Sequence, residues 1–440
     1  MQIAKIKKLL GLAQIWEIDL SDWVSPVLKV LSSQVLLQVI GFIISVLLIR
    51  QMDKENYAIY TIFFSLQAII TILSDSGILL GFNAIGGKVW NDNEKFASLL
   101  KTASYLRAKI TVLAFIIAAI YGTSILVKQD FSPFQILIVI ISLLFIVSPE
   151  IYKAFIKQAL LFRKEVGTVQ MVDIIHQSLR LALFTTVIFL LKNDLNILWV
   201  LCITVVSVWI SFLFIIKKSK HIRSPLAKIN LEYKSELLHY IKINWHNSAF
   251  FSFHGQISIF LIGILGTTTS LAELGALTRF SLIFTGISVL VSNILGPAFG
   301  KCQNKTKLFQ TYIIALVGIL IFTAITLLVV YFFPYQLLWI LGSQYQQLSH
   351  ELFLIFVFCS IGLVSSTIFC LNSYKGWIRF SPFLEIPANI ISLAVGVLLF
   401  DISTLEGVLY LSIIGAFTNL VLYTANSFAG FKQLDISYKF

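Results

Sequence analysis

Long apolar runs separated by short polar segments dominate this chain of 440 residues. A helix needs about 20 apolar residues to cross the roughly 30 Å hydrocarbon layer of a membrane, and twelve runs come close to that length. Their residues do not alternate strictly between apolar and polar, so we expect helices rather than barrel strands. The twelve predicted spans are 28–49, 57–82, 108–127, 134–152, 170–191, 197–216, 240–265, 274–298, 308–332, 350–373, 381–400 and 405–428. The runs therefore predict an all-α polytopic membrane protein.

The composition agrees with this class. Hydrophobic residues make up 58% of the chain and charged residues 12%, whereas a soluble domain is about half apolar and about a quarter charged. The start of the chain is basic, but Trp16, Glu17 and Asp19 precede any small-residue cleavage site, so we expect the first span to be an uncleaved anchor. The four cysteines show no metal-ligand spacing. We expect neither a metal nor another cofactor.

Lysine and arginine residues determine the predicted orientation. With the N-terminus in the cytoplasm, 27 of the 33 basic residues fall on the cytoplasmic side, and Arg180 and Arg279 fall within spans. The basic residues on the outer side are Arg50, Lys54, Lys128 and Lys192. This bias follows the positive-inside rule and agrees with an even number of spans. We therefore predict a multi-pass protein with both termini in the cytoplasm, and we read its net charge of +12 as a consequence of topology rather than of nucleic-acid binding.

A six-residue segment occurs twice, about half a chain apart. "YKAFIK" at 152–157 and "YKGWIR" at 374–379 share three residues, and each closes the fourth span of a half, with its basic residues expected at the cytoplasmic surface. A weaker similarity links 55–66 with 273–284. The matching positions indicate a duplicated six-helix unit; alternatively, aromatic–basic pairs recur because they suit membrane interfaces.

The repeat leads to a predicted domain organisation. It consists of a cytoplasmic segment 1–27, a six-helix bundle 28–216, a basic cytoplasmic linker 217–239, a second six-helix bundle 240–428 and a cytoplasmic tail 429–440. We expect the two bundles to be pseudo-symmetric around a central cleft, and we expect one to rock against the other during transport.

Two arginines lie inside predicted spans, where a charged side chain costs about 2.5–3.5 kcal/mol on insertion scales. Arg279 lies near the outer end of its span, where its guanidinium either binds the oxygens of a phosphate or diphosphate in the cleft, or reaches the outer surface. Arg180 lies near the middle of its span and shares a helical face with Asp173 and His176. It therefore contacts a substrate or forms an internal ion pair.

Four further ionisable residues are candidates. His254 lies on a polar face of span seven, where it lines the cleft or bonds to a neighbouring helix. Asp75 and Glu385 are candidate carriers of a coupling proton or cation; otherwise each is a neutral carboxyl or is bonded to a neighbouring serine or the backbone. Arg50 ends span one beside acidic residues, so it lies at the outer mouth of the cleft or forms a surface ion pair.

Residues 46–82, "VLLIRQMDKENYAIYTIFFSLQAIITILSDSGILLGF", resemble the first two helices of the O-antigen and polysaccharide flippases. These form a branch of the multidrug/oligosaccharidyl-lipid/polysaccharide exporter superfamily. The shared pattern is a span ending in Arg50, a short acidic turn, a tyrosine-rich start to the next span, and a "D-x-G" exit at Asp75. Residues 273–301 and 406–423 are similar to spans eight and twelve of the same family.

The resemblance implies a function. It implies a flippase, not an enzyme, that moves an undecaprenyl-diphosphate-linked oligosaccharide, such as the O-antigen repeat unit, across the bacterial inner membrane by alternating access. Arg50 and Arg279 match basic positions of the family pattern and are implied substrate contacts, whereas Arg180 and His254 are candidates from the residues alone. The implied partners are the lipid-linked oligosaccharide, the bilayer, and a polysaccharide polymerase with its chain-length regulator.

Other function classes fit the sequence less well. A multidrug exporter of the same superfamily would favour an acid-lined apolar pocket for organic cations, whereas this chain keeps two arginines in its spans. A membrane glycan polymerase would need catalytic groups outside the membrane, and the longest predicted outer loop, 333–349, contains no charged residue. A scaffold without transport activity would not explain the arginines.

Overall fold

The computed structural model describes residues 20–191, 195–222 and 227–437. Most of the predicted segment 1–27, together with Lys192 and residues 438–440 of the tail, lies outside the described residues. In the described part every regular element is helical, and eleven helices are long and apolar enough to cross a membrane, or twelve when one bent pair counts as a single span. The predicted class of an all-α membrane protein with twelve spans is confirmed.

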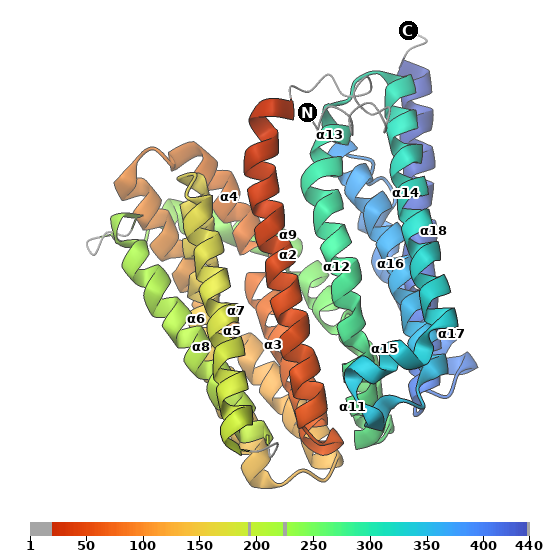
Figure 1. Cartoon of the computed structure of the whole chain (residues 1–440). Coiled ribbons are helices and arrows are strands. Elements are labelled where there is room, and N and C mark those ends of the chain that lie inside the picture. The colour runs from red at the N-terminus through yellow and green to blue at the C-terminus, as the bar shows by residue number, and fades with distance from the viewer. Residues whose placement is uncertain (1–19, 192–194, 223–226, 438–440) are drawn as a thin grey trace.

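Two lobes stand side by side in Figure 1. The N-terminal lobe contains α2 (Leu20–Gln51), α3 (Lys54–Asp75), α4 (Ile78–Val89), α5 (Asn93–Lys128), α6 (Pro133–Phe162), α7 (Val166–Leu191) and α8 (Ile197–Lys218). The C-terminal lobe contains α10 (Ile257–Leu265), α11 (Thr268–Leu277), α12 (Ser281–Leu290), α13 (Gly296–Lys301), α14 (Lys305–Phe332), α15 (Pro334–Leu341), α16 (Ser349–Lys375), α17 (Ser381–Leu399) and α18 (Leu405–Ser437). Helix α9 (Leu231–His254) leads into α10 yet packs against α3, α4 and α5, so it links the lobes.

Three predicted spans are broken helices. Span two is α3 followed by α4, because Ser76 and Gly77 adopt left-handed backbone with φ of 39° and 88°. Span seven is the pair α9 and α10, bent by 51°. Span eight consists of α11, a 3-10 turn at Thr278–Phe280, α12, a π turn at Val291–Leu295, and α13. Interrupted helices free backbone groups from the helical ladder, and transporters commonly place such interruptions beside binding sites.

Helices α5 and α6 extend well beyond their apolar runs. α5 begins at Asn93, before the run 108–127, because the Asp92 carboxylate accepts hydrogen bonds from two backbone N–H groups of the first turn. α6 continues past "YKAFIK" to Phe162. As a result, Lys153 is only 2% exposed, and its predicted position at the cytoplasmic surface is wrong. Hydropathy marks the apolar part of a helix, whereas capping groups set its ends.

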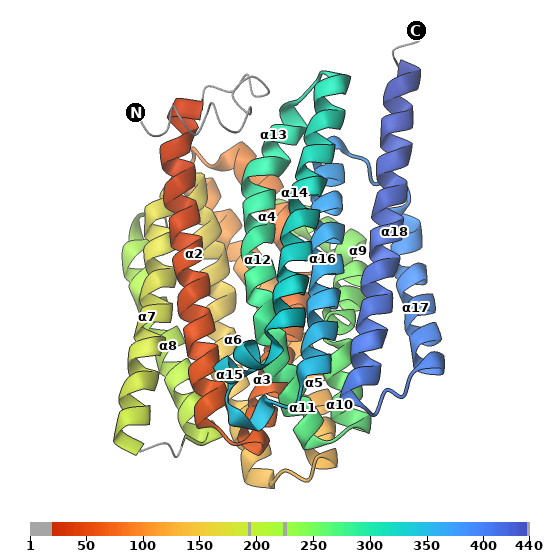
Figure 2. The same cartoon turned by 45° about the vertical axis from the view of Figure 1, so that its right-hand side comes forward.

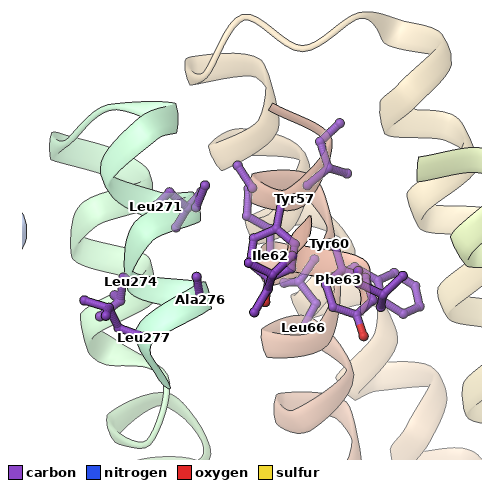
Figure 3. Packing of buried hydrophobic residues seen from close by; sticks show 14 of the residues in the cluster. Tyr57, Tyr60, Ile62, Phe63, Leu66, Leu271, Leu274, Ala276 and Leu277 are labelled. Carbon is purple, nitrogen blue, oxygen red and sulfur yellow. The ribbon is translucent and has the colours of Figure 1, made fainter. Parts of the chain in front are cut away.

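Helix α3 occupies the middle of the molecule. In its most apolar stretch of 18 residues, 72% of the residues are buried, which is the largest share among the described spans. Its Tyr57 lies beside Leu271 and Ala276 of α11 in Figure 3. Gly275 allows this close approach, because a methyl group at that position would collide with the Thr61 side chain. The two lobes therefore touch along α3 and α11.

Candidate functional site

Polar contacts join the lobes where α2 ends and α3 begins. The Lys54 ammonium lies 2.7 Å from a carboxylate oxygen of Glu273 in α11, and these side chains are 21% and 10% exposed. Arg50 donates from Nε to the carbonyl of Ile340 (2.9 Å) and from Nη2 to the carbonyl of Trp339 (2.5 Å). These carbonyls end α15, where the helix dipole favours a cation.

Two glutamines add further contacts between the lobes. Gln344 donates to the carbonyl of Ile49 (3.0 Å). Gln129 donates to the carbonyl of Gly263 (2.8 Å) and accepts a hydrogen bond from the Thr268 hydroxyl (2.7 Å). We name these residues the clasp: Arg50, Lys54, Gln129, Glu273 and Gln344. The elements that carry the clasp meet at the bottom of Figures 1 and 2, opposite the start of α2 and the end of α18.

We expect Glu273→Gln to loosen the clasp, because the Lys54 ammonium would stay partly buried without its carboxylate. Breaking a buried ion pair costs about 3–5 kcal/mol, and the partial exposure of Lys54 reduces that cost. The measurement is the rate at which a membrane-impermeant thiol reagent labels Thr61→Cys, which we expect to rise at least about fivefold, equivalent to about 1 kcal/mol.

The matched control restores the charge pair in reverse, as Lys54→Glu with Glu273→Lys. Labelling of Thr61→Cys in this variant should return toward the starting rate. Equal labelling in all three backgrounds would show that the ion pair does not hold the lobes together.

Aromatic residues of α3 bring two arginines together. Tyr57, Tyr60 and Phe64 share one helical face because they are three and four residues apart. Arg279, in the turn between α11 and α12, donates from Nε to the Tyr57 hydroxyl (3.1 Å), and its guanidinium carbon is 5.5 Å from the ring centres of Tyr60 and Phe64. Arg180 of α7 donates from Nη2 to the Tyr60 hydroxyl (3.0 Å) and lies 5.5 Å from the centre of the Phe64 ring. We name these five residues the arginine cage.

The arginine cage holds two positive charges within the membrane-spanning part of the fold. Arg180 is 8% exposed, and Arg279 is partly exposed. Within the described ranges no carboxylate forms an ion pair with either guanidinium, and the buried Nε of Arg180 has no hydrogen-bond partner there. Aromatic rings favour each cation by about 0.5–2 kcal/mol. Forked donors of this kind match a phosphate or diphosphate group.

The internal ion pair considered for Arg180 forms elsewhere. Asp173 pairs with Lys157 of α6, and Glu150 pairs with the buried Lys153. Both carboxylates lie within predicted spans, whereas Lys153 and Lys157 lie on the part of α6 that extends beyond its apolar run. Because Asp173 is engaged with Lys157, the Arg180 guanidinium is available to the arginine cage.

Asp75 ends α3 at the break before α4. Its carboxylate accepts a hydrogen bond from the backbone N–H of Leu79 (3.3 Å) and interacts electrostatically with Arg107 of α5. Arg107 is 4% exposed and lies 5.1 Å from the centre of the Phe155 ring. Arg107 is one of the 27 basic residues predicted on the cytoplasmic side, because the predicted span begins at residue 108.

His254 and Glu385 line two cavities in the C-terminal lobe. His254 ends α9, stacks on Phe250 at 5.3 Å between ring centres, and lines a cavity of about 360 Å³. Glu385 of α17 accepts a hydrogen bond from the Tyr423 hydroxyl (2.5 Å) and lines a second cavity of about 270 Å³. The predicted site residues thus fall into two separate groups. One group lies around α3, and the other lies in the C-terminal lobe.

An apolar groove of about 340 Å³ runs between α2 and α12, at the junction of the two lobes. Except for Gln34, Gln38 and Gly286, its lining consists of valine, leucine, isoleucine and phenylalanine. One lining residue, Phe42, packs against Phe280 with ring centres 6.2 Å apart, and Phe280 directly follows Arg279 in the chain. The chain neighbour of Arg279 thus packs against one wall of the groove.

Solved structures identify the architecture. An inward-facing multidrug resistance MATE family transporter of the MOP superfamily matches 91% of this chain and 96% of its own, with a TM-score of 0.62 and 13% identity. The lipid II flippase MurJ in an inward closed conformation matches 93% of this chain and 90% of its own, with a TM-score of 0.59 and 15% identity. The chain has the fold of the MOP-superfamily transporters.

A third structure and two further comparisons complete this result. The eukaryotic MATE transporter AtDTX14 matches 90% of this chain and 91% of its own, with a TM-score of 0.55 and 15% identity. No protein-family model and no curated protein matches the chain. These three structures are of transporters and a flippase, and at these identities they show the two-lobed, twelve-span fold alone.

Proposed function

We propose that this protein is a flippase that moves an undecaprenyl-diphosphate-linked oligosaccharide, such as an O-antigen repeat unit, across the bacterial inner membrane. The observation that carries the proposal is the arginine cage, in which Arg180 and Arg279 both lie over the Phe64 ring and both contact Tyr60. Among the described residues, no carboxylate pairs with either guanidinium. A diphosphate supplies the missing negative charge and several acceptor oxygens for the two forked donors.

The apolar groove between α2 and α12 supports a lipid-linked substrate. Its aliphatic and aromatic lining suits a polyprenyl chain, and Phe42 and Phe280 connect it to the residue next to Arg279. When the diphosphate of the substrate binds in the arginine cage, its lipid tail would therefore extend along this groove and out from between the lobes. One structure of this fold is a lipid II flippase, so the fold is compatible with such a substrate.

The clasp supports a mechanism of alternating access. The clasp closes one end of the molecule, while the lobes diverge toward the other end in Figure 1. The bias of the basic residues favours a cytoplasmic position for the diverging end and for both termini, so we infer an inward-facing state. We propose that Arg50, released when the clasp opens, contacts the substrate at the outer mouth, and that Asp75, at the break after α3, carries a coupling proton or cation.

One further proposed property concerns the proteins beside which this one acts. We propose that the protein acts beside a polysaccharide polymerase and its chain-length regulator, because the flipped repeat unit would be their substrate.

A flux comparison tests the proposal. We expect the purified protein in proteoliposomes to move a polyprenyl-diphosphate oligosaccharide between leaflets at least about tenfold faster than empty liposomes, and to move an organic cation no faster than they do. The readout is the fraction of glycan accessible to an added glycosidase, alongside uptake of a fluorescent cation. Cation transport without glycan flipping would instead assign the protein to the multidrug exporters.

A further inference from the structure

The two cavities of the C-terminal lobe are neighbours with polar linings. The larger lies where α9 bends into α10, against α16, α17 and α18, and the smaller lies between α9, α16 and α17. Phe369 lines both cavities, and the hydrogen bond from Tyr423 of the larger to Glu385 of the smaller joins them. We name this combined space the C-lobe cavity. Its two parts, about 360 and 270 Å³, fall in or near the range of about 300–1,000 Å³ typical of ligand pockets.

The lining of the C-lobe cavity combines hydroxyl and amide groups with aromatic rings. The hydrogen-bonding groups come from serines and asparagines on five helices, among them Asn247, Ser258, Ser365, Ser381, Ser412 and Asn419. Phe251, Phe358 and Phe369 supply apolar faces. Such a lining matches a sugar ring, because a sugar presents hydroxyl groups around its edge and C–H groups on its faces.

The charge of the C-lobe cavity differs from that of the arginine cage. Among the described lining residues there is no lysine or arginine, and Glu385 is the carboxylate. The basic residues nearest along the chain are engaged elsewhere: Lys375 donates to the carbonyls of Gly300 and Cys302, and the Arg379 guanidinium lies over the Phe380 ring. The only lining base is His254, which stacks on Phe250.

A carboxylate in such a site accepts hydrogen bonds from sugar hydroxyls and repels a second carboxylate. Charge-assisted hydrogen bonds are about twice as strong as neutral ones, and like charges placed together cost several kcal/mol. Glu385 therefore strengthens the binding of a neutral sugar and weakens the binding of an acidic one.

We propose that the C-lobe cavity binds a sugar of the lipid-linked glycan and selects uncharged sugars over uronic acids and other carboxylated sugars. The proposal rests on the proposed flippase function. It assigns the diphosphate to the arginine cage and the adjoining glycan to Glu385, Tyr423 and the hydroxyl groups around them. It also gives Glu385 a role in specificity in place of the coupling role that the sequence suggested.

The experiment compares two polyprenyl-diphosphate disaccharides that differ in one sugar, glucose or glucuronic acid. We expect the wild-type protein in proteoliposomes to flip the neutral lipid at least about tenfold faster, equivalent to about 1.4 kcal/mol. Glu385→Gln should slow the neutral lipid and bring the ratio of the two rates close to one. Glu385→Asp, which keeps the charge, should preserve a preference for the neutral lipid.

One control variant accompanies this experiment, and two outcomes distinguish the possible failures. Glu406→Gln removes an exposed carboxylate of the same lobe, paired with His350 at 3.2 Å, and should leave the ratio unchanged. Equal flipping of both lipids by the wild-type protein, or preference for the acidic one, would overturn the sugar assignment and leave the flippase function standing. Failure to flip either lipid would overturn the flippase function itself.

Discussion

Replacing Arg279 with alanine should abolish flipping of a polyprenyl-diphosphate oligosaccharide, lowering the rate by at least about 100-fold. Truncating one partner of a buried hydrogen-bonded charge pair costs about 2–5 kcal/mol, and the proposal makes Arg279 of the arginine cage and the substrate diphosphate such a pair. The measurement is the initial rate of leaflet exchange in proteoliposomes, with the amount of inserted protein determined for each preparation.

Two variants accompany this experiment. Arg279→Lys keeps the charge but loses the planar fork, so its rate should lie between those of the wild type and Arg279→Ala. Arg379→Ala removes an exposed arginine that is predicted to lie on the cytoplasmic side, and this variant should flip lipid at the wild-type rate. A fully active and correctly inserted Arg279→Ala protein would remove Arg279 from substrate binding and with it the observation that supports the flippase function.

A disulfide between α3 and α11 should stop transport completely and reversibly. A Cβ atom built at Gly275 lies 3.0 Å from the Cβ atom of Thr61, and disulfides place these atoms about 3.5–4.5 Å apart, so Thr61→Cys with Gly275→Cys can bond after a small shift. The background variant has alanine in place of the native cysteines Cys202, Cys302, Cys359 and Cys370. Oxidation should abolish flipping, and a reducing agent should restore it.

The reduced form of the same double variant is the control, because it differs from the oxidised form only in the covalent bond. Mass spectrometry gives the fraction of cross-linked protein. If fully cross-linked protein flips lipid at the reduced rate, the contact between α3 and α11 does not open during transport, and the proposed alternating access is wrong.

The fold could be predicted from the sequence because twelve apolar runs fix the number of helices that lipid can hold. The helix ends could not, because they depend on local caps such as Asp92 and on backbone turns such as Ser76–Gly77. This explains why Arg107 and Lys153, which lie on helix extensions, were placed at the surface. The two copies of the repeated segment also differ for this reason: α16 ends at Lys375, where Gly376 is left-handed, whereas α6 continues.

The candidate site was predictable in part. Arg180 and Arg279 stood out because charges are costly in lipid, but their positions are 99 residues apart and no local rule predicts that they meet. Tyr57, Tyr60 and Phe64 carried an overlooked signal, since their spacing places three aromatic rings on one face of the most buried span. Rings on one face are usually ordinary packing, so only the folded arrangement identifies them as a platform for two cations.

Lys54 and Tyr57 lie within one turn of each other on α3, so a single helix carries part of the clasp and part of the proposed substrate site. The Tyr57 hydroxyl accepts a hydrogen bond from Arg279 and donates one to the carbonyl of Gly275 (3.4 Å). A bound diphosphate would draw Arg279 away and weaken this junction, whereas an idle molecule keeps it. Substrate binding would then open the contact between the lobes. A protein without substrate would stay closed at that end, so it would not leak ions and would preserve the ion gradients across the membrane.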